Sequence, residues 1–175
     1  MAELTIKGIY RDTLIDAGGR LLSDSGWRSN LIVVRCRMLI AGFMMNENKT
    51  FGIQQMQVGK GSAVWDTTPP VAPLPITETL VDGSPFTLTL GPSLVLQYLD
   101  EKDNVLPKGP STRIQIVATL GPGQPPPVSG TTYPLREFGL FGKLNDQLAM
   151  IDYIRHPVIQ KDTSVTLERR VRLIF

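Results

Sequence analysis

His156 and Cys36 are the side chains of this sequence best suited to metal binding or nucleophilic catalysis, and each is the sole residue of its type. A metal site needs several histidine, cysteine or carboxylate ligands, and a nucleophile needs a histidine held by an acid. One histidine and one cysteine, far apart in the chain, satisfy neither pattern, and no GxSxG motif is present. We therefore expect neither an enzyme nor a bound metal or cofactor. His156 is interpreted as a strand-end residue with a backbone or carboxylate partner, and Cys36 as a small buried apolar residue.

The run Gly59-Lys60-Gly61-Ser62 resembles part of a phosphate-binding loop. That loop has the pattern GxxxxGK[ST] and leads directly into a helix, whereas here a proline-rich stretch follows. We interpret the run as a tight turn after a strand. The adjacent acids Asp100 and Glu101 are interpreted in the same way, as a solvated turn.

The stretch LREFGLFG, residues 135–142, lies between a proline-rich segment and the polar KLND. It is interpreted as the first strand of a hairpin whose turn is KLND. Gly139 and Gly142 are expected where another backbone approaches closely or where φ is positive. Phe138 and Phe141 enter either the domain's own core or a contact with a neighbouring subunit.

Four polar or aromatic residues are further candidates for interaction. Arg136 and Glu137 are expected to face outward at a subunit contact, the alternative being an exposed ion pair of little energetic worth. Trp65 lies next to a proline-rich segment. Arg35 lies in an apolar run, and Arg37 points about 200° away from it around a helix. At least one of these two arginines is expected to reach a rim or a neighbouring subunit.

The elements that position these residues begin with a hairpin. Two short extended runs, Arg11–Asp16 and Arg20–Asp24, flank a Gly-Gly tip, which is a strong hairpin signal. Ser29 or Asn30 then suits the N-cap of a helix over the next fifteen residues, which are apolar on nearly all sides. Such a helix must be covered, so we place it in the core, against a sheet.

Alternating polar and apolar residues predict further strands. These cover residues 53–58, 86–90, 94–100 and 113–120, with 86–90 and 94–100 interpreted as a pair around Gly91-Pro92. The closing segment has one apolar face, made of Val165, Leu167, Val171, Leu173 and Phe175. Arg169 is the one charge on that face. Because the sequence ends within this strand, we expect its last residues to be pinned in a sheet.

Proline-rich segments separate these elements. The chain has 175 residues with 16 glycines and 14 prolines. Residues 67–77 and 121–134 cannot form helix or central strand, and we interpret them as loops or extended polyproline arms. We expect a single structural domain over residues 1–175. It is mainly β and sandwich-like, with seven to nine short strands, one buried N-terminal helix and the two arms.

Composition narrows the class of partner. Hydrophobic residues make up 42% and charged residues 19%, as in ordinary globular proteins. The net charge is +2 without a dense basic run, so we expect no nucleic-acid partner. The apolar run over residues 31–45 is interrupted by two arginines, so we expect no membrane span. A single cysteine excludes an internal disulfide.

Several motifs follow one another in a distinctive order. They are a hairpin with a glycine tip (DAGGRLLSD), SNLI at 29–32, VGxG at 58–61, WDxTPP at 65–70, EFGLF at 137–141, and HPxIxKD…L…R…LxF from His156 to Phe175. As an ordered set covering most of the chain, they resemble small structural proteins of tailed bacteriophages and related contractile injection systems, in particular the tail-fibre attachment group.

The resemblance implies a virion protein of the tail, made in the cytoplasm of a bacterial host. Its partners would be copies of itself and other tail structural proteins. Fibre proteins of this kind usually continue into a shaft and a receptor-binding tip, whereas this sequence stops at Phe175. The chain therefore looks like the anchoring module alone, either an adaptor at the baseplate or a ring or collar protein at the neck.

A second hypothesis is a free-standing β-sandwich that binds a ligand such as a glycan. The loops beside Trp65 and Tyr133 would supply aromatic platforms for sugar rings. Isolated aromatic residues in proline-rich loops also serve as packing contacts. Both functions remain open from the sequence.

Overall fold

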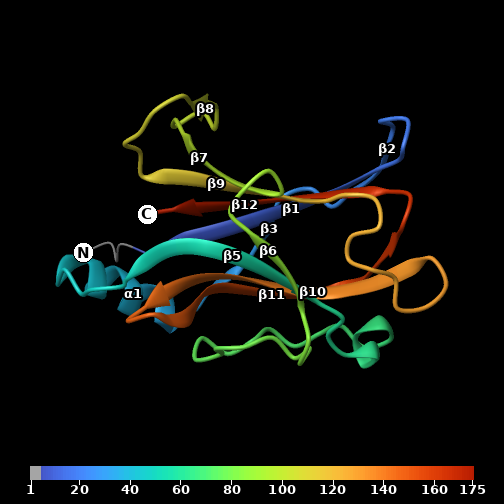
Figure 1. Ribbon diagram of the computed structural model, residues 1–175, viewed down its shortest axis with the longest axis horizontal. Helices are drawn as coiled ribbons and strands as arrows, with labels where there is room; N and C mark the ends of the chain where they lie inside the picture. The colour runs from blue at the N-terminus through green and yellow to red at the C-terminus, as the bar shows by residue number, and fades with distance from the viewer. Residues whose placement is uncertain (1–4) are drawn as a thin grey trace.

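The chain folds into two antiparallel β-sheets stacked face to face, as seen in a computed structural model that describes residues 5–175 (Figure 1). The mainly β character and the two layers are as predicted. The predicted strand number is wrong, because twelve strands lie within residues 5–175 instead of seven to nine. Three of the twelve have only two residues each, which is too short to carry an alternating pattern.

The first sheet, sheet A, has the order β2-β1-β12-β9-β7-β8, with β3 also pairing with β1. Its strands are β1 (Lys7–Ile15), β2 (Leu21–Asp24), β3 (Arg28–Ser29), β7 (Leu94–Leu99), β8 (Val105–Leu106), β9 (Arg113–Leu120) and β12 (Thr166–Ile174). The predicted hairpin around the Gly-Gly tip is confirmed as β1 and β2. Strand β12 lies between β1 and β9, so the end of the sequence is held in the sheet as expected.

The second sheet, sheet B, has the order β4-β11-β10-β5-β6. Its strands are β4 (Leu31–Ile32), β5 (Phe51–Gly59), β6 (Phe86–Thr89), β10 (Thr132–Leu144) and β11 (Gln147–Asp162). The long β10–β11 hairpin turns at Asn145 and Asp146, which both have positive φ, and this confirms the predicted turn at KLND.

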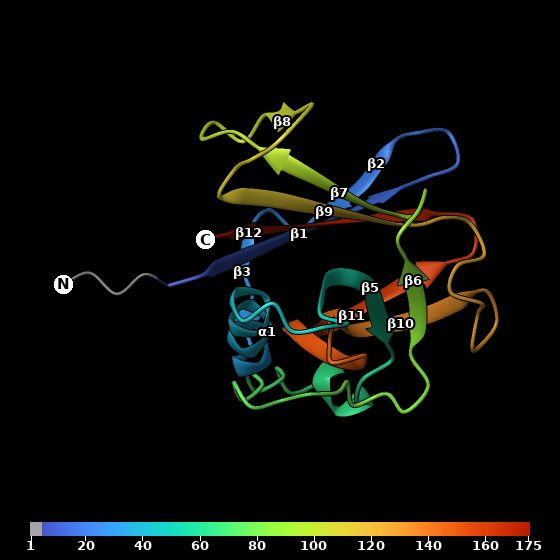
Figure 2. The same ribbon diagram turned by 60° about the vertical axis from the view of Figure 1, so that its left-hand side comes forward.

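Strands β6 and β7 were predicted to pair with each other, and this prediction is wrong. Strand β6 pairs with β5 in sheet B, whereas β7 pairs with β9 in sheet A. Between them the chain crosses from one layer to the other at Gly91, whose φ of 151° favours glycine (Figure 2). Two adjacent alternating runs look alike whether they form a hairpin or a crossing between layers.

The helix α1 (Val34–Met44) is shorter and less buried than predicted. Ser29 and Leu31 belong to β3 and β4, so the helix begins after Val33 and has no side-chain cap. It lies at one end of the sandwich and packs against β10 and β11 (Figure 1). Only one face is buried, whereas Met38 and Met44 are exposed, so the helix covers an edge of the core instead of crossing it.

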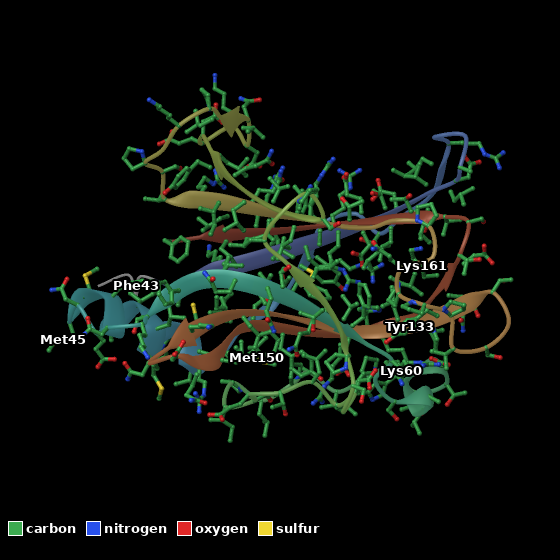
Figure 3. All side chains as sticks on the ribbon, viewed as in Figure 1. Phe43, Met45, Lys60, Tyr133, Met150 and Lys161 are labelled. Carbon is green, nitrogen blue, oxygen red and sulfur yellow. The ribbon has the colours of Figure 1, made fainter. Side chains whose placement is uncertain are left out.

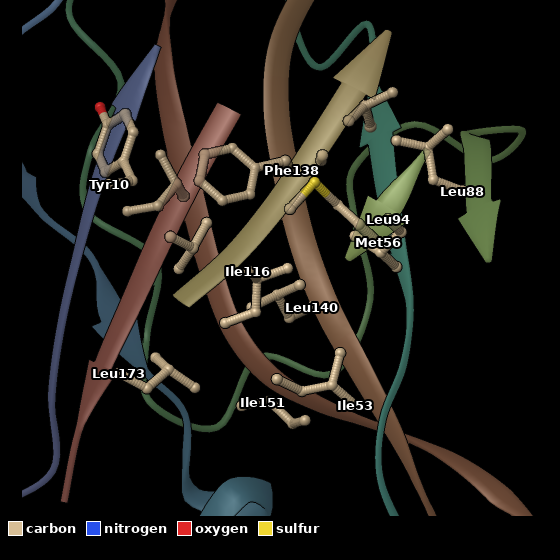
Figure 4. Packing of buried hydrophobic residues seen from close by; sticks show 14 of the residues in the cluster. Tyr10, Ile53, Met56, Leu88, Leu94, Ile116, Phe138, Leu140, Ile151 and Leu173 are labelled. Atoms are coloured by element: carbon tan, nitrogen blue, oxygen red, sulfur yellow. The ribbon is translucent and has the colours of Figure 1, made fainter. Parts of the chain in front are cut away.

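The main core fills the space between the sheets (Figure 4). Phe138 and Leu140 of β10 and Met56 of β5 face Ile116 of β9, and all four are fully buried. The ring of Tyr10 meets that of Phe138 edge to face at 5.4 Å between centroids. These inward residues alternate with residues on the outer face of sheet B, as the period of a strand requires.

Strand β12 presents its predicted apolar face to this core, with Leu167, Val171 and Leu173 buried. Phe175 departs from the prediction, because it follows the end of the strand and is 47% exposed. Arg169 lies on the apolar face as predicted and is 1% exposed. Its guanidinium binds both carboxylate oxygens of Asp12 in β1, at 2.6 and 2.8 Å, so the buried charge is paired with an opposite one.

His156 was predicted at a strand end, but it lies within β11. The register of β10 and β11 shifts between Leu135 and Glu137, so that the residues around Pro157 bulge out of the ladder. Proline has no N–H to donate to the neighbouring strand, which favours a bulge. The predicted backbone partner of His156 is confirmed, since its Nδ1 lies 2.7 Å from the carbonyl oxygen of Pro157.

The two proline-rich arms are loops for most of their length. Residues 67–77 run along the outer face of sheet B, after the short 3-10 helix η1 (Ala63–Asp66) (Figure 1). The second arm is shorter than predicted, because β10 begins at Thr132. Pro134 fits in this strand since β5 pairs with β10 only from Glu137 onward, so its missing N–H faces no neighbour.

Candidate functional site

Arg136 and Glu137 lie under residues 60–82, here called the covering segment. The expectation that these two side chains face outward is therefore wrong. Arg136 is 7% exposed and Glu137 is fully buried. Neighbouring residues of a regular strand point to opposite faces. Both of these side chains reach the same covering segment because the strand register shifts beside them.

Glu137 anchors the C-terminal end of the covering segment. Its carboxylate accepts hydrogen bonds from the backbone N–H groups of Val81 and Asp82, at 2.9 and 2.6 Å, and from the hydroxyl of Tyr153. Burial, then the bond to Glu137, raise the pKa of Tyr153 to about 12. The buried carboxylate is therefore fully occupied in holding the chain, and no solvent-facing oxygen is left for an outside partner.

Arg136 anchors the N-terminal end of the covering segment. Its guanidinium donates to both oxygens of Asp66 at 2.7 Å and to the carbonyl oxygen of Lys60 at 2.9 Å. The bond from Arg136 lowers the pKa of Asp66. Two-pronged contacts of this kind fix direction as well as distance. Arg136 thus sets the position of η1, on which Trp65 lies.

The indole of Trp65 packs against other residues of the same chain. A Cβ on Gly61 would lie 2.4 Å from the indole, so glycine is required there. The Arg155 guanidinium lies 5.4 Å from the Trp65 ring centroid and 5.1 Å from that of Tyr153, which places a cation between two aromatic rings. Arg155 also donates to the carbonyl oxygen of Val71 at 3.4 Å.

The middle of the segment is fixed next to the helix. The backbone N–H of Val34, at the start of α1, donates to the carbonyl oxygen of Pro75 at 2.8 Å. Arg35 binds both oxygens of Glu78, at 2.6 and 2.9 Å. Arg35 therefore reaches a rim, one of the two predicted outcomes, while Arg37 is exposed elsewhere on α1.

The two phenylalanines of LREFGLFG take different roles. Phe138 belongs to the main core, as described above. Phe141 lies on the opposite face of β10 in a small cluster with Leu80, Met150 and Tyr153, beneath the covering segment. Figure 3 marks Met150 on this side of sheet B. Five of the six predicted interaction residues therefore contact or support one feature, the covering segment, and Phe138 does not.

Both glycines of LREFGLFG allow close approach, as predicted. A Cβ on Gly139 would lie 3.1 Å from the carbonyl oxygen of Asp152, and one on Gly142 would lie 2.6 Å from that of Gly52. Neither has a positive φ. Sequence reasoning missed Tyr153 and Arg155, which complete the anchors. The sequence pattern that could have revealed them is a tyrosine and an arginine two positions apart, which lie on the same face of the strand that follows LREFGLFG.

Residues 67–77, here called the docking arm, present apolar side chains to solvent from a fixed backbone. Val71, Leu74 and Ile76 are 79%, 65% and 73% exposed. The arm itself contains no charged residue. The acids on either side, Asp66 and Glu78, are bound to Arg136 and Arg35. The result is a neutral apolar strip on the outside of the molecule.

Tyr133 does not offer a platform for a sugar ring. It is 5% exposed, and burial and the nearby Asp82 carboxylate raise its pKa to about 12. Figure 3 shows Tyr133 close to Lys60, at the end of the sandwich opposite Phe43. With Tyr133 buried and Trp65 facing Arg155, the two aromatic residues do not form an exposed pair.

Other chemistry-bearing residues give structural contacts. Cys36 is buried as predicted, and burial raises the pKa of its thiol to about 11. Within residues 5–175, no group of three or more histidine, cysteine or acidic side chains is arranged to hold a metal ion. No helix in this part of the chain is long and apolar enough to cross a membrane.

Comparison of the chain with protein-family models, curated proteins and solved structures finds no match.

Proposed function

We propose that this protein is a structural subunit of a larger protein assembly, with the docking arm as an assembly surface. The observation that carries the proposal is the exposure of Val71, Leu74 and Ile76 on a backbone held at both ends and in the middle. Exposed apolar side chains are ordinary when scattered and mobile. A row of them fixed in place is typical of a binding surface, because little conformational entropy is lost on docking.

The order of sequence motifs supports a particular kind of assembly. We propose the tail of a bacteriophage or of a related contractile injection system, with the protein acting as a fibre-anchoring adaptor at the baseplate or as a ring or collar component at the neck. The partners are copies of this chain and other tail proteins. In this proposal the protein is not an enzyme, is made in the bacterial cytoplasm and ends in the virion.

The test is the protein composition of particles. Tails or injection particles are purified by density gradient from bacteria that produce the chain, and the gradient fractions are quantified by mass spectrometry. The proposal predicts that the chain sediments with tail proteins at a constant ratio to them. A chain found only in the slowly sedimenting fractions, while complete particles are present further down the gradient, would overturn it.

A further inference from the structure

One end of the sandwich is open, so that part of the core-facing surface of sheet A is exposed. Leu96 and Tyr98 of β7 pair with Ile116 and Ile114 of β9 on the inner face, yet they are 41% and 42% exposed. The five strands of sheet B leave this corner uncovered, because its edge strand β6 has only four residues. A groove of about 480 Å³ results.

The helix supplies the opposite wall of the groove. Cys36, Leu39 and Phe43 recur at the spacing of one helix face and all line it. Figure 3 shows Phe43 at this end of the molecule. Leu173 and Phe175 also line the groove, and no charged side chain lines it within residues 5–175. Its size is within the range of ligand pockets, and its surface is almost wholly apolar.

The apolar, uncharged lining of the groove determines what kind of segment can bind in it. An apolar groove without charges disfavours any segment that brings charges or unpaired backbone N–H groups, because their loss of water is not compensated. The sequence VAPLPI of the docking arm meets the first condition, because it is uncharged. It meets the second in part, because two of its six residues, Pro73 and Pro75, have no N–H. The carbonyl oxygens of Val71 and Pro75 already accept hydrogen bonds within the same chain.

The docking arm cannot fill the groove of its own chain. Its anchors hold it on the outer face of sheet B, below that sheet in Figure 1, whereas β7 and β9 lie in the other layer. The arm contacts α1 at its first residue, Val34, while the groove is lined by the face that includes Phe43. The strip and the groove are thus two separate surfaces of one molecule.

We propose that residues 71–76 of one copy occupy the apolar groove of the next copy. This inference rests on the proposed function and adds the identity of one contact. The contact joins two different surfaces, so it is heterologous, and repeated it gives a closed ring or an open helical stack. The extended, proline-rich arm enters with little loss of conformational freedom. Each copy covers the exposed core face of its neighbour.

The test uses one variant of each surface. Leu74→Asp places a charge on the arm, and Leu96→Asp places one in the groove at a residue that is already partly exposed. Leu21→Asp is the control, since Leu21 is an exposed apolar residue on β2, far from both surfaces (Figure 1). Molar mass is measured by light scattering across the micromolar range for each purified chain and for mixtures.

The expected pattern is specific to a heterologous contact. The wild type and Leu21→Asp exceed the monomer mass as concentration rises, while Leu74→Asp and Leu96→Asp each remain monomers. An equal mixture of the two monomeric variants reaches twice the monomer mass and stops there. Only one productive contact is then left, between the intact arm of one variant and the intact groove of the other.

Two results would overturn the inference. One is a wild type that stays monomeric throughout; the other is a wild type that associates while the mixture of variants does not. If Leu96→Asp does not fold, Phe43→Glu on the helix side of the groove replaces it with the same expected pattern. A chain that enters particles but never self-associates refutes this contact and leaves the proposed function standing. Absence from particles refutes the proposed function itself.

Discussion

The hydroxyl of Tyr153 donates a hydrogen bond to the carboxylate of Glu137, and neither side chain is exposed to solvent. Tyr153 comes from β11 and Glu137 from β10, so the bond lies across the hairpin that carries the docking arm. With the N–H groups of Val81 and Asp82, the carboxylate has three donors. This arrangement makes Glu137 the main fastening point of the arm's C-terminal side.

Replacing Glu137 by glutamine tests this fastening. The amide has one acceptor oxygen, so at least one donor loses its partner, which costs about 1–3 kcal/mol of unfolding free energy. We expect that loss in urea unfolding, together with faster proteolysis between residues 60 and 82. Glu78→Gln is the control, since its pair with Arg35 is half exposed and should change stability by less than about 1 kcal/mol. Equal stability of Glu137→Gln and wild type would contradict the assigned role.

Neutral His156 in sheet B is hydrogen-bonded to Arg169 in sheet A and so connects the two sheets. Its Nε2 accepts a hydrogen bond from the Arg169 guanidinium at 3.0 Å, so the ring proton is on Nδ1, toward the Pro157 carbonyl oxygen. Burial, then the charge of Arg169, lower the pKa of His156 to about 4; the Asp12 carboxylate opposes this, and Arg28 adds to it. Protonation would place a second cation beside Arg169 in the core.

Stability should therefore depend on pH through His156. An unfolded histidine has a pKa near 6.5, so its contribution is complete above that pH and is lost as the pH falls toward 4. At roughly 1.4 kcal/mol per pKa unit, the loss is about 3 kcal/mol. We expect the difference in unfolding free energy between wild type and His156→Gln to shrink over this range in urea titrations. A difference that stays constant from pH 4 to 8 would show that His156 does not carry the dependence.

Asp152 gives a pH dependence of the opposite sign. It is fully buried, and burial raises its pKa to about 7, against hydrogen bonds from the Leu140 N–H and the Asn30 side chain. Its contribution is complete below the unfolded pKa near 4 and is lost as the pH rises toward 7. The curve of the wild type alone mixes this effect with that of His156.

Asp152→Asn separates the two. We expect this variant to be more stable than the wild type at pH 8, by at least about 1 kcal/mol, because a buried charge is removed. The new amide can donate to Oδ1 of Asn30, which has no partner in the described structure, once the Asn30 amide turns over. Asp152→Ala should be destabilised instead, since the Leu140 N–H loses its acceptor. Thermal unfolding at pH 5 and pH 8 measures both, and an Asn variant weaker than wild type at pH 8 would refute the assignment.

Gly142 tests the close packing of the hairpin. A Cβ there would lie 2.6 and 2.7 Å from the carbonyl oxygens of Gly52 and Phe51, which are backbone atoms and cannot turn aside. We expect Gly142→Ala to lower the unfolding free energy by about 1–3 kcal/mol. Gly83→Ala meets nothing within 4 Å and should leave stability nearly unchanged. Similar effects of the two substitutions in urea unfolding would argue against close approach at Gly142.

Local pattern predicted much of the fold. The alternation in β9 and β12, the Gly-Gly hairpin tip and the close approach at Gly142 all depend on neighbours in the chain or on the absence of a side chain. Arg169 could also be recognised as the single charge on an apolar face. These features are encoded within a few residues, so a single sequence reveals them.

The predictions from the sequence were wrong where the surroundings of a residue are formed by segments distant in the chain. Arg136 and Glu137 look like solvent-facing residues of a strand, and only the return of residues 60–82 over sheet B buries them. The crossing between layers at Gly91 gives the same local pattern as a hairpin. Arg169 and Asp12 are far apart in the chain, so their pairing is a product of sheet topology.

Competition for places in the particle tests the docking arm most directly. Wild type and Leu74→Asp, distinguished by mass, are produced together in a host whose own copy is deleted, and their ratio in purified particles is compared with that in the lysate. An assembly role of the arm predicts that Leu74→Asp is depleted at least about tenfold in particles, as a contact change of roughly 1.4 kcal/mol would give. The surface control Leu21→Asp should keep its lysate ratio. Leu74→Asp entering particles as freely as Leu21→Asp would contradict the assembly role of the docking arm.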